Sequence, residues 1–388
     1  MANDGAASSL LEVARRFRPR ILAEREHTEA GRRLSVDLTR ELAGAGFFRI
    51  SLPAAYGGLD LTPIEAMEVY EELARADASV AWCVWNGNVN WTTAQLSKEV
   101  AQAVFADPGM ILANSTRPSG QAVVVEGGYR VSGRWSLVSG CQLSSWFVLL
   151  SVVHENGAPR RTPSGAPESR FMLCPASDCE IVDTWTTGGL RGTGSHDVVV
   201  RDLFVPDRQA SYFTDPFVLP GSRYRIPSTS RVIPGLAAMA LGVARNAIEA
   251  LVDLAVDKRN ERTSQSLRDD RGAQTRLSQA EALVGSARLF LFDTITRLWN
   301  DVLAGREAPM PARAQVRLAS WHAVTSATQA VDLIYLTGGA TSLYVTCPLE
   351  RGFRDVHAMT QHIAVHPRIL ETTGRVLFGL EPEIPLMV

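Results

Sequence analysis

The stretch Gly189-Leu-Arg-Gly-Thr-Gly-Ser-His-Asp-Val-Val-Val-Arg-Asp-Leu-Phe-Val-Pro206 joins a glycine-rich segment to a run of β-branched residues. The glycines do not have the GxGxxG spacing of a dinucleotide-binding loop, and the segment lies between two predicted strands rather than before a helix. We therefore interpret it as a turn, followed by a strand over residues 197–205. It closes a zone whose residue pattern is that of β-structure.

That β-zone covers residues 111–222. A hairpin is predicted around Gly127-Gly128, a pair that tolerates the positive φ of a tight turn. Further strands are predicted over residues 145–153, 170–174 and 180–185. Short strands separated by turns favour an antiparallel sandwich or barrel.

Helical zones flank the β-zone on both sides, so we expect three domains: 1–110, 111–222 and 223–388. Thr62, Pro63 and Glu65 form the pattern of a capping box with proline at the first helical position. The next helix is predicted over residues 77–96. After the β-zone, long helices are predicted from about residue 230, over 275–303 and over 312–336.

Composition excludes several classes of function. The 388 residues carry 39 Lys and Arg against 41 Asp and Glu, a net charge of −2, which argues against a nucleic acid or an anionic membrane as partner. The apolar stretch 232–256 is interrupted by charged residues, and no signal peptide is visible, so we expect a cytoplasmic protein. The five cysteines form no CxxC pair, so neither a disulfide framework nor a zinc site is expected.

Two further segments make the order of zones specific. Tyr56-Gly-Gly-Leu-Asp-Leu61 lies between early helices, and Thr337-Gly-Gly precedes Leu349-Glu-Arg-Gly-Phe-Arg-Asp355 near the C-terminus. Together with residues 189–206 they resemble the acyl-CoA dehydrogenase superfamily over residues 10–375. The resemblance implies an α+β fold: an N-terminal helical domain, a central antiparallel β-sandwich or barrel, and a C-terminal four-helix bundle. It also implies a flavin between the β-domain and the bundle, and a homotetramer.

The residue that defines a dehydrogenase in this superfamily is absent. Dehydrogenation of an acyl thioester needs a carboxylate to remove a weakly acidic C–H proton. The usual position of that carboxylate, counted from Arg354-Asp355, is Ile363, and the alternative position lies in the acid-free run 226–231. The dehydrogenase mechanism therefore lacks its base.

The run from Arg354 to His362 instead resembles the oxygenase components of two-component flavin monooxygenases. The resemblance implies reduced flavin (FADH2 or FMNH2) supplied by a separate NAD(P)H:flavin reductase. It also implies that O2 forms a flavin C4a-hydroperoxide, which hydroxylates a small aromatic substrate, phenolic or indolic. No dinucleotide fingerprint follows a predicted strand, in agreement with an external reductase. The alternatives are N- or S-oxygenation, an acyl-CoA dehydrogenase-type flavin oxidoreductase and a binding subunit without catalysis.

Two residues are the catalytic candidates that the resemblance implies. Ser139, followed by Gly140, matches the hydroxyl that the superfamily places beside flavin N5, and His362 matches the histidine that accepts a substrate proton. His357 and His366 are competitors of His362. The spacing of His362 and His366 would suit a metal, but Pro367 disfavours a helix there and no third ligand is evident, so no metal is expected.

The remaining candidates concern cofactor and substrate. Arg231 resembles an arginine beneath the active site, and Arg262 resembles one that reaches the flavin phosphates of a neighbouring subunit. Gln265 replaces the usual phenylalanine, which leaves FAD and FMN both open. A nucleotide contact or a helix C-cap would each explain Gly338-Gly339. An aromatic-binding pocket is predicted where tryptophan alternates with asparagine, at Trp82, Trp85, Asn86 and Trp91.

Overall fold

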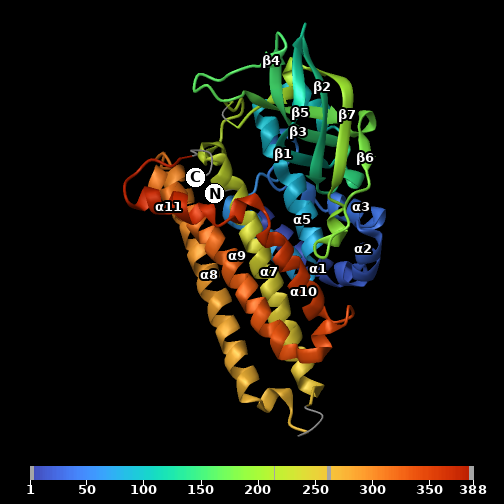
Figure 1. The fold of residues 1–388 in the computed structure, drawn as a ribbon, viewed down its shortest axis with the longest axis vertical. Helices are drawn as coiled ribbons and strands as arrows, with labels where there is room; N and C mark the ends of the chain where they lie inside the picture. Colours follow the sequence, from blue (N-terminus) through green and yellow to red (C-terminus); the bar gives the residue numbers. More distant parts are fainter. Residues whose placement is uncertain (1–3, 214, 260–263, 384–388) are drawn as a thin grey trace.

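The computed structural model describes residues 4–213, 215–259 and 264–383 and has a helical–β–helical order (Figure 1). The N-terminal helices are α1 (Asp4–Ala23), α2 (Arg25–Gly31), α3 (Val36–Gly44), α4 (Pro63–Ala76), α5 (Ala78–Gly87) and α6 (Lys98–Val104). The strands are β1 (Leu112–Val125), β2 (Gly128–Val138), β3 (Trp146–Glu155), β4 (Ala158–Pro159), β5 (Ser169–Pro175), β6 (Glu180–Val182), β7 (His196–Pro206) and β8 (Ala210–Ser211). The C-terminal helices are α7 (Ser228–Asp257), α8 (Arg271–Leu303), α9 (Met310–Gly338), α10 (Pro348–Thr360) and α11 (Arg368–Leu377).

The capping box at the start of α4 is confirmed. Thr62 Oγ1 accepts the backbone N–H of Glu65, and the Glu65 carboxylate accepts the N–H of Thr62 at 2.7 Å. The helix predicted over residues 77–96 is too long, because α5 ends at Gly87 and continues as a 3₁₀ helix to Gln95. Asn88 explains the change: its Nδ2 donates to the Val84 carbonyl at 2.7 Å, the acceptor that a further α-helical turn would use.

The β-zone forms one sheet in the order β6-β7-β2-β1-β3-β5-β8, with β4 paired to β3. The predicted hairpin is confirmed, with Gly127 in the turn at φ +73°. The wholly antiparallel arrangement is wrong, because β1 and β3 are parallel. The edge of β2 that faces away from β1 is occupied by β7, so β3 does not pair with β2. Instead, β3 pairs with the other edge of β1 and runs parallel to β1.

The centre of the bundle is α7, which packs on α4, α9 and α10. By length and composition α7 could cross a membrane, but 72% of its most apolar window is buried inside the fold, as in a core helix. Glycine allows α4 to approach closely, since a Cβ on Gly242 would lie 2.2 Å from the Glu71 carbonyl. One hydrophobic core therefore joins the N-terminal helices to the bundle.

The two longest sequence motifs meet where the loop before β7 lies on α10. The N–H of Leu190 donates to Asp355 Oδ1 at 2.7 Å, and the Arg354 guanidinium donates to the Gly188 carbonyl. A Cβ on Gly189 would lie 2.1 Å from the Arg354 carbonyl oxygen, so only glycine permits this approach. We call this set of contacts, made by residues 188–190 with Arg354 and Asp355, the loop–α10 contact.

The loop–α10 contact predicts that alanine substitutions at two adjacent glycines, Gly189 and Gly188, differ in their effect on stability. Gly189→Ala should lower the free energy of unfolding by about 2 kcal/mol, because the new methyl group overlaps the backbone of α10. Gly188→Ala is the matched control: its Cβ would have nothing within 4 Å, so its effect should stay within about 0.5 kcal/mol. Urea denaturation of both variants measures this, and equal effects would contradict the close approach.

Candidate active site

A cavity of about 330 Å³ lies between the sheet and the helical layers. Its wall is formed by α4, α5, β1, β5, the start of α7, the second turn of α9 and the segment after α10. Four of the candidates from the sequence line it, namely Trp85, Asn86, Arg231 and His362. The volume is at the small end of ligand pockets, which suits a molecule of one or two rings.

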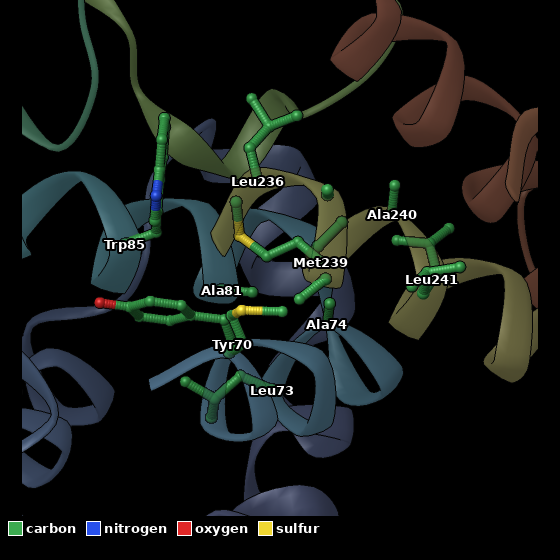
Figure 2. Close-up of a cluster of buried hydrophobic side chains, with 14 of the residues drawn as sticks. Tyr70, Leu73, Ala74, Ala81, Trp85, Leu236, Met239, Ala240 and Leu241 are labelled. Atoms are coloured by element: carbon green, nitrogen blue, oxygen red, sulfur yellow. The ribbon is translucent and has the colours of Figure 1, made fainter. Parts of the chain in front are cut away.

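Trp85 lies near Tyr70 of α4 and Leu236 of α7 (Figure 2), and it lines the cavity. Its indole Nε1–H donates to the Val232 carbonyl at 3.0 Å, and Tyr70 and Leu236 belong to the same hydrophobic core. A Cβ on Gly235 would lie 2.8 Å from the indole, so the glycine allows α7 to pack on this face. The neighbouring Asn86 accepts from Asn114 Nδ2 at 3.0 Å, which fixes a polar group beside the ring.

His362 lies two residues after α10 and caps a short 3₁₀ helix, Ile363–Val365. Its ring makes edge-to-face contacts with Trp82 and Trp85, with centroid separations of 5.6 and 5.8 Å. Its Nδ1 accepts the backbone N–H of Ala364 at 3.2 Å. A neutral imidazole has one donor and one acceptor, so the proton of His362 is on Nε2.

The electrostatic environment keeps His362 neutral. Burial, and then the charges of Arg317 and Arg117, lower the pKa of His362 to about 4. The ring is therefore uncharged at neutral pH. With Nδ1 occupied by Ala364, its free group is a hydrogen-bond donor, Nε2–H.

Ser139 begins a line of hydroxyl groups with a single direction. Trp82 Nε1–H donates to Ser139 Oγ at 3.0 Å, Ser139 and Ser195 are 2.7 Å apart, and Ser195 and Thr193 are 2.7 Å apart. Thr193 donates its only proton to the Leu190 carbonyl at 2.8 Å, so it must accept from Ser195. Ser195 must then accept from Ser139. We call Ser139, Ser195 and Thr193 the hydroxyl relay.

The hydroxyl relay decides what Ser139 can bind. Its proton goes to Ser195 and one lone pair accepts from Trp82, so one acceptor position remains. A reduced flavin presents an N–H at N5, whereas the oxidised ring presents an acceptor there. The acceptor at Ser139 therefore fits the reduced form.

Leu137, two residues before Ser139, has an unusual backbone conformation. It is 46% exposed and has φ +61°, a left-handed conformation that is rare for a branched residue. Such strain is concentrated at functional sites. After Ser139 the chain turns at Gly140, which has φ +74°.

Other candidates lie away from the cavity or outside the described residues. Arg262 and the side chain of Trp91 are outside them. Gly338 and Gly339 end α9, with Gly338 21 residues beyond Arg317, or about 30 Å along the helix. Within one chain they therefore do not meet Ser139 or His362.

The competing histidines are also placed elsewhere. His357 pairs with Asp332 at 2.9 Å, and His366 is exposed and accepts the Arg368 N–H. Neither lines the cavity. Within residues 4–213, 215–259 and 264–383, no group of three His, Cys, Asp or Glu side chains is placed to hold a metal ion.

Sequence reasoning missed three residues of the site. Thr193 and Ser195 lie inside the motif at 189–206, but their role depends on contacts with residues about 55 positions away. Arg317 lines the cavity and is 2% exposed. The sequence does contain a signal for Arg317. This arginine shares a helical face with Ser320 and Val324, so a charged residue interrupts a buried face of α9.

The helical–β–helical fold, with a hydroxyl-lined site next to an aromatic cavity, defines a flavoprotein of the acyl-CoA dehydrogenase type. Residues 6–103 match the family "Acyl-CoA dehydrogenase, N-terminal domain", and residues 234–367 match "Acyl-CoA dehydrogenase, C-terminal domain".

Individual relatives show which group of this superfamily the chain resembles. The chain is 31% identical to "Flavin-dependent monooxygenase, oxygenase subunit HsaA" of Mycobacterium tuberculosis, with 97% of each chain covered. It is 30% identical to "Indole-3-acetate monooxygenase" of Pseudomonas putida, covering 90% of this chain and 89% of that protein. The crystal structure of 3-HSA hydroxylase from Rhodococcus sp. RHA1 has a TM-score of 0.89 at 30% identity, covering 98% and 99% of the two chains. The chain belongs to the flavin-dependent monooxygenases of the acyl-CoA dehydrogenase superfamily.

The lowered pKa of His362 predicts an acid-sensitive contribution to stability. Between pH 6.5 and about 4 the unfolded ring binds a proton that the folded ring does not, so the free energy of unfolding falls as pH falls through this window. At pH 4.5 the loss from this group should be about 2 to 3 kcal/mol.

Urea denaturation at pH 7 and pH 4.5 measures that loss. His362→Gln, which cannot titrate, should lose less stability than the wild type over this interval, while exposed His366→Gln should behave as the wild type. An unchanged pH dependence in His362→Gln would contradict the electrostatic description of the cavity.

Proposed function

We propose that the protein is the oxygenase component of a two-component monooxygenase, which uses reduced flavin and O2 to hydroxylate a small aromatic ring, phenolic or indolic. The chemistry that a bound reduced flavin supplies is the two-electron activation of O2. The protein binds and orients the two partners, excludes water and holds protons at defined atoms. The observation that carries this proposal is the fixed direction of the hydroxyl relay.

Ser139 binds the reduced cofactor in this proposal. Its remaining lone pair accepts an N–H, and Ser195 and Thr193 are positioning residues that keep its own proton turned away. With a reduced flavin bound, a hydrogen bond from its N–H to Ser139 would oppose loss of that proton. Gly140 and Leu137 border the same position, and Arg231 is a further candidate contact with the flavin.

His362 is the group that faces the substrate. Its Nε2–H donates to the oxygen of a bound phenol, which stabilises the ionised form and makes the ring carbon nucleophilic. The phenol proton leaves to solvent on binding. Acceptance of a proton by His362, as an indole N–H would require, needs the opposite tautomer, which conflicts with the N–H of Ala364. Trp85 and Asn86 hold the ring by stacking and by a polar edge, with Trp82 behind His362 and Trp91 as a further candidate.

A dehydrogenase is disfavoured by the chemistry of the cavity wall. Both positions where the superfamily carries its base, Ile363 and the start of α7, line the cavity. Among the described residues of that wall there is no aspartate or glutamate, so no carboxylate there can take an α-proton. N- or S-oxygenation uses the same flavin chemistry, but the fixed indole of Trp85 favours an aromatic substrate.

The partners in this proposal are a separate NAD(P)H:flavin reductase and further copies of the chain in a homotetramer, in the cytoplasm. Exposed apolar side chains follow Gly339, namely Leu343, Tyr344 and Val345, each at least 66% exposed. Such a patch suits a subunit interface. Gly338, Gly339 and Arg262 would then contact the flavin of a neighbouring copy, either FAD or FMN.

The hydroxyl relay predicts a preference for reduced over oxidised flavin. Anaerobic titration of both forms of FMN and FAD should show tighter binding of the reduced form. Ser139→Ala and Thr193→Val should each decrease this preference about fivefold, the worth of one hydrogen bond. Thr187→Val removes a hydroxyl of the same loop outside the relay and should leave the preference unchanged. Equal affinity of the wild type for both forms would overturn the assignment.

The role of His362 is separable from that of Ser139. When the reduced complex is mixed rapidly with O2, Ser139→Ala should shorten the delay before oxidised-flavin absorbance returns. His362→Ala should keep the delay but lose about 100-fold in hydroxylated product. His362→Gln keeps an N–H donor and should recover part of that loss. Absence of any delay in the wild type would exclude a monooxygenase.

A further inference from the structure

Two asparagines of the cavity wall are hydrogen-bonded to each other where α5 meets β1. Asn86 is the penultimate residue of α5, and Asn114 is the third residue of β1. Asn114 Nδ2 donates to the backbone carbonyl of Asn86 at 3.1 Å and to Asn86 Oδ1 at 3.0 Å. Both residues line the cavity. We call Asn86 and Asn114 the asparagine pair.

The hydrogen bonds of the asparagine pair identify each amide atom. A backbone carbonyl can only accept, so the Asn114 atom that faces the Asn86 carbonyl is the amide nitrogen. Two N–H groups cannot hydrogen-bond to each other, so the Asn86 atom that meets this nitrogen is the amide oxygen. Both N–H groups of Asn114 are then used. Among the described residues, the asparagine pair is left with one free acceptor, Asn114 Oδ1, and one free donor group, Asn86 Nδ2.

A third asparagine of the wall, Asn88, has no free donor. Its two N–H groups donate to the carbonyls of Phe47 and Val84 at 2.8 and 2.7 Å. Its Oδ1 accepts the backbone N–H of Ser51 at 3.1 Å, and the residue is 5% exposed. The amide of Asn88 therefore serves the fold, whereas the asparagine pair is half-buried and keeps free atoms for a ligand.

The free atoms of the asparagine pair determine which chemical group fits them. They belong to two side chains, so a group that meets both needs an acceptor for Asn86 Nδ2 and a donor for Asn114 Oδ1 at two separate atoms. A carboxylate, an ester or a ketone has acceptors only and would leave Asn114 Oδ1 desolvated without a partner, which is unfavourable. A hydroxyl has both functions on a single oxygen. An amide has a C=O and an N–H at two atoms.

We propose that the substrate is a phenol that carries an amide group. The amide C=O accepts from Asn86 Nδ2 and the amide N–H donates to Asn114 Oδ1, while the ring lies against Trp85 and its oxygen meets His362. This inference rests on the proposed function, in which the ring occupies this cavity, and it makes Asn114 a specificity-determining residue. The amide takes no part in the flavin chemistry, so experiments can separate the two proposals.

Amides and methyl ketones of the same shape test this proposal, because CH3 replaces NH2 with little change in size. Binding of 4-hydroxybenzamide and 4-hydroxyacetophenone, and of 4-hydroxyphenylacetamide and 4-hydroxyphenylacetone, is measured by calorimetry on the full chain without flavin. The wild type should bind at least one amide about tenfold tighter than its ketone, the effect of leaving a buried acceptor unpaired. Asn114→Leu, of similar size, should bring that ratio close to one.

Two further variants separate the donor from the acceptor. Asn86→Asp keeps an acceptor for Asn114 Nδ2 but removes the free donor, so it should weaken the ketone, which has only an acceptor, about tenfold. Asn156→Asp is the matched control: it makes the same change at an exposed position outside the cavity wall and should alter neither ligand.

Three outcomes would overturn the proposal: equal binding of amide and ketone by the wild type, an unchanged ratio in Asn114→Leu, or no binding of either pair. If circular dichroism shows that Asn114→Leu does not fold, unchanged ketone binding by Asn86→Asp overturns it instead. Tighter binding of 4-hydroxyphenylacetate or 4-hydroxyphenylethanol than of 4-hydroxyphenylacetamide would also overturn it, and would assign the asparagine pair to an acid or a hydroxyl group. Rapid mixing with O2 tests the function separately. Hydroxylation of amide and ketone at equal kcat/KM would remove the amide specificity and leave the oxygenase intact.

Discussion

The loop–α10 contact is the constraint on which the site depends. The Leu190 N–H is bound by Asp355, and the Leu190 carbonyl accepts from Thr193, so one residue ties the hydroxyl relay to α10. His362 follows α10 by two residues. A shift of the loop would therefore change the direction of the Ser139 hydroxyl and the position of the imidazole together. The absence of a side chain on Gly189 makes this distance possible.

Burial and charge determine the protonation states of His362 and Arg317. A buried arginine and a protonated histidine at close range would repel each other, so the ring of His362 stays neutral while Arg317 keeps its charge. The backbone N–H of Ala364 then fixes the tautomer. His362 presents a donor to the cavity, whereas Ser139, on the other side of Trp82, presents an acceptor. The two halves of the site thus differ in hydrogen-bond polarity.

Local patterns predicted most of the helices, because capping and helical periodicity depend on neighbouring residues, as Thr62 and Glu65 illustrate. They could not predict that β1 and β3 are parallel. That pairing depends on β7, a strand distant in the sequence, which occupies the free edge of β2. In the site, His362, Trp85, Asn86 and Arg231 were placed through the resemblance and through residue type. The hydroxyl relay and Arg317 could be recognised only from three-dimensional contacts. A serine in a glycine-rich loop and an arginine in a helix are common in proteins and do not by themselves indicate a site.

The close packing of α7 on α4 and α5 also has a consequence for synthesis on the ribosome. The helices α4 and α5 bury their apolar faces against a helix that ends 170 residues after α5. At about 5 to 20 residues per second, the ribosome needs about 10 to 30 seconds to make that interval. Throughout it the early helices are without their partner, while the β-sheet, which pairs within its own segment, can form first. Chaperones that shield apolar surface therefore have their longest period of action on the N-terminal helices.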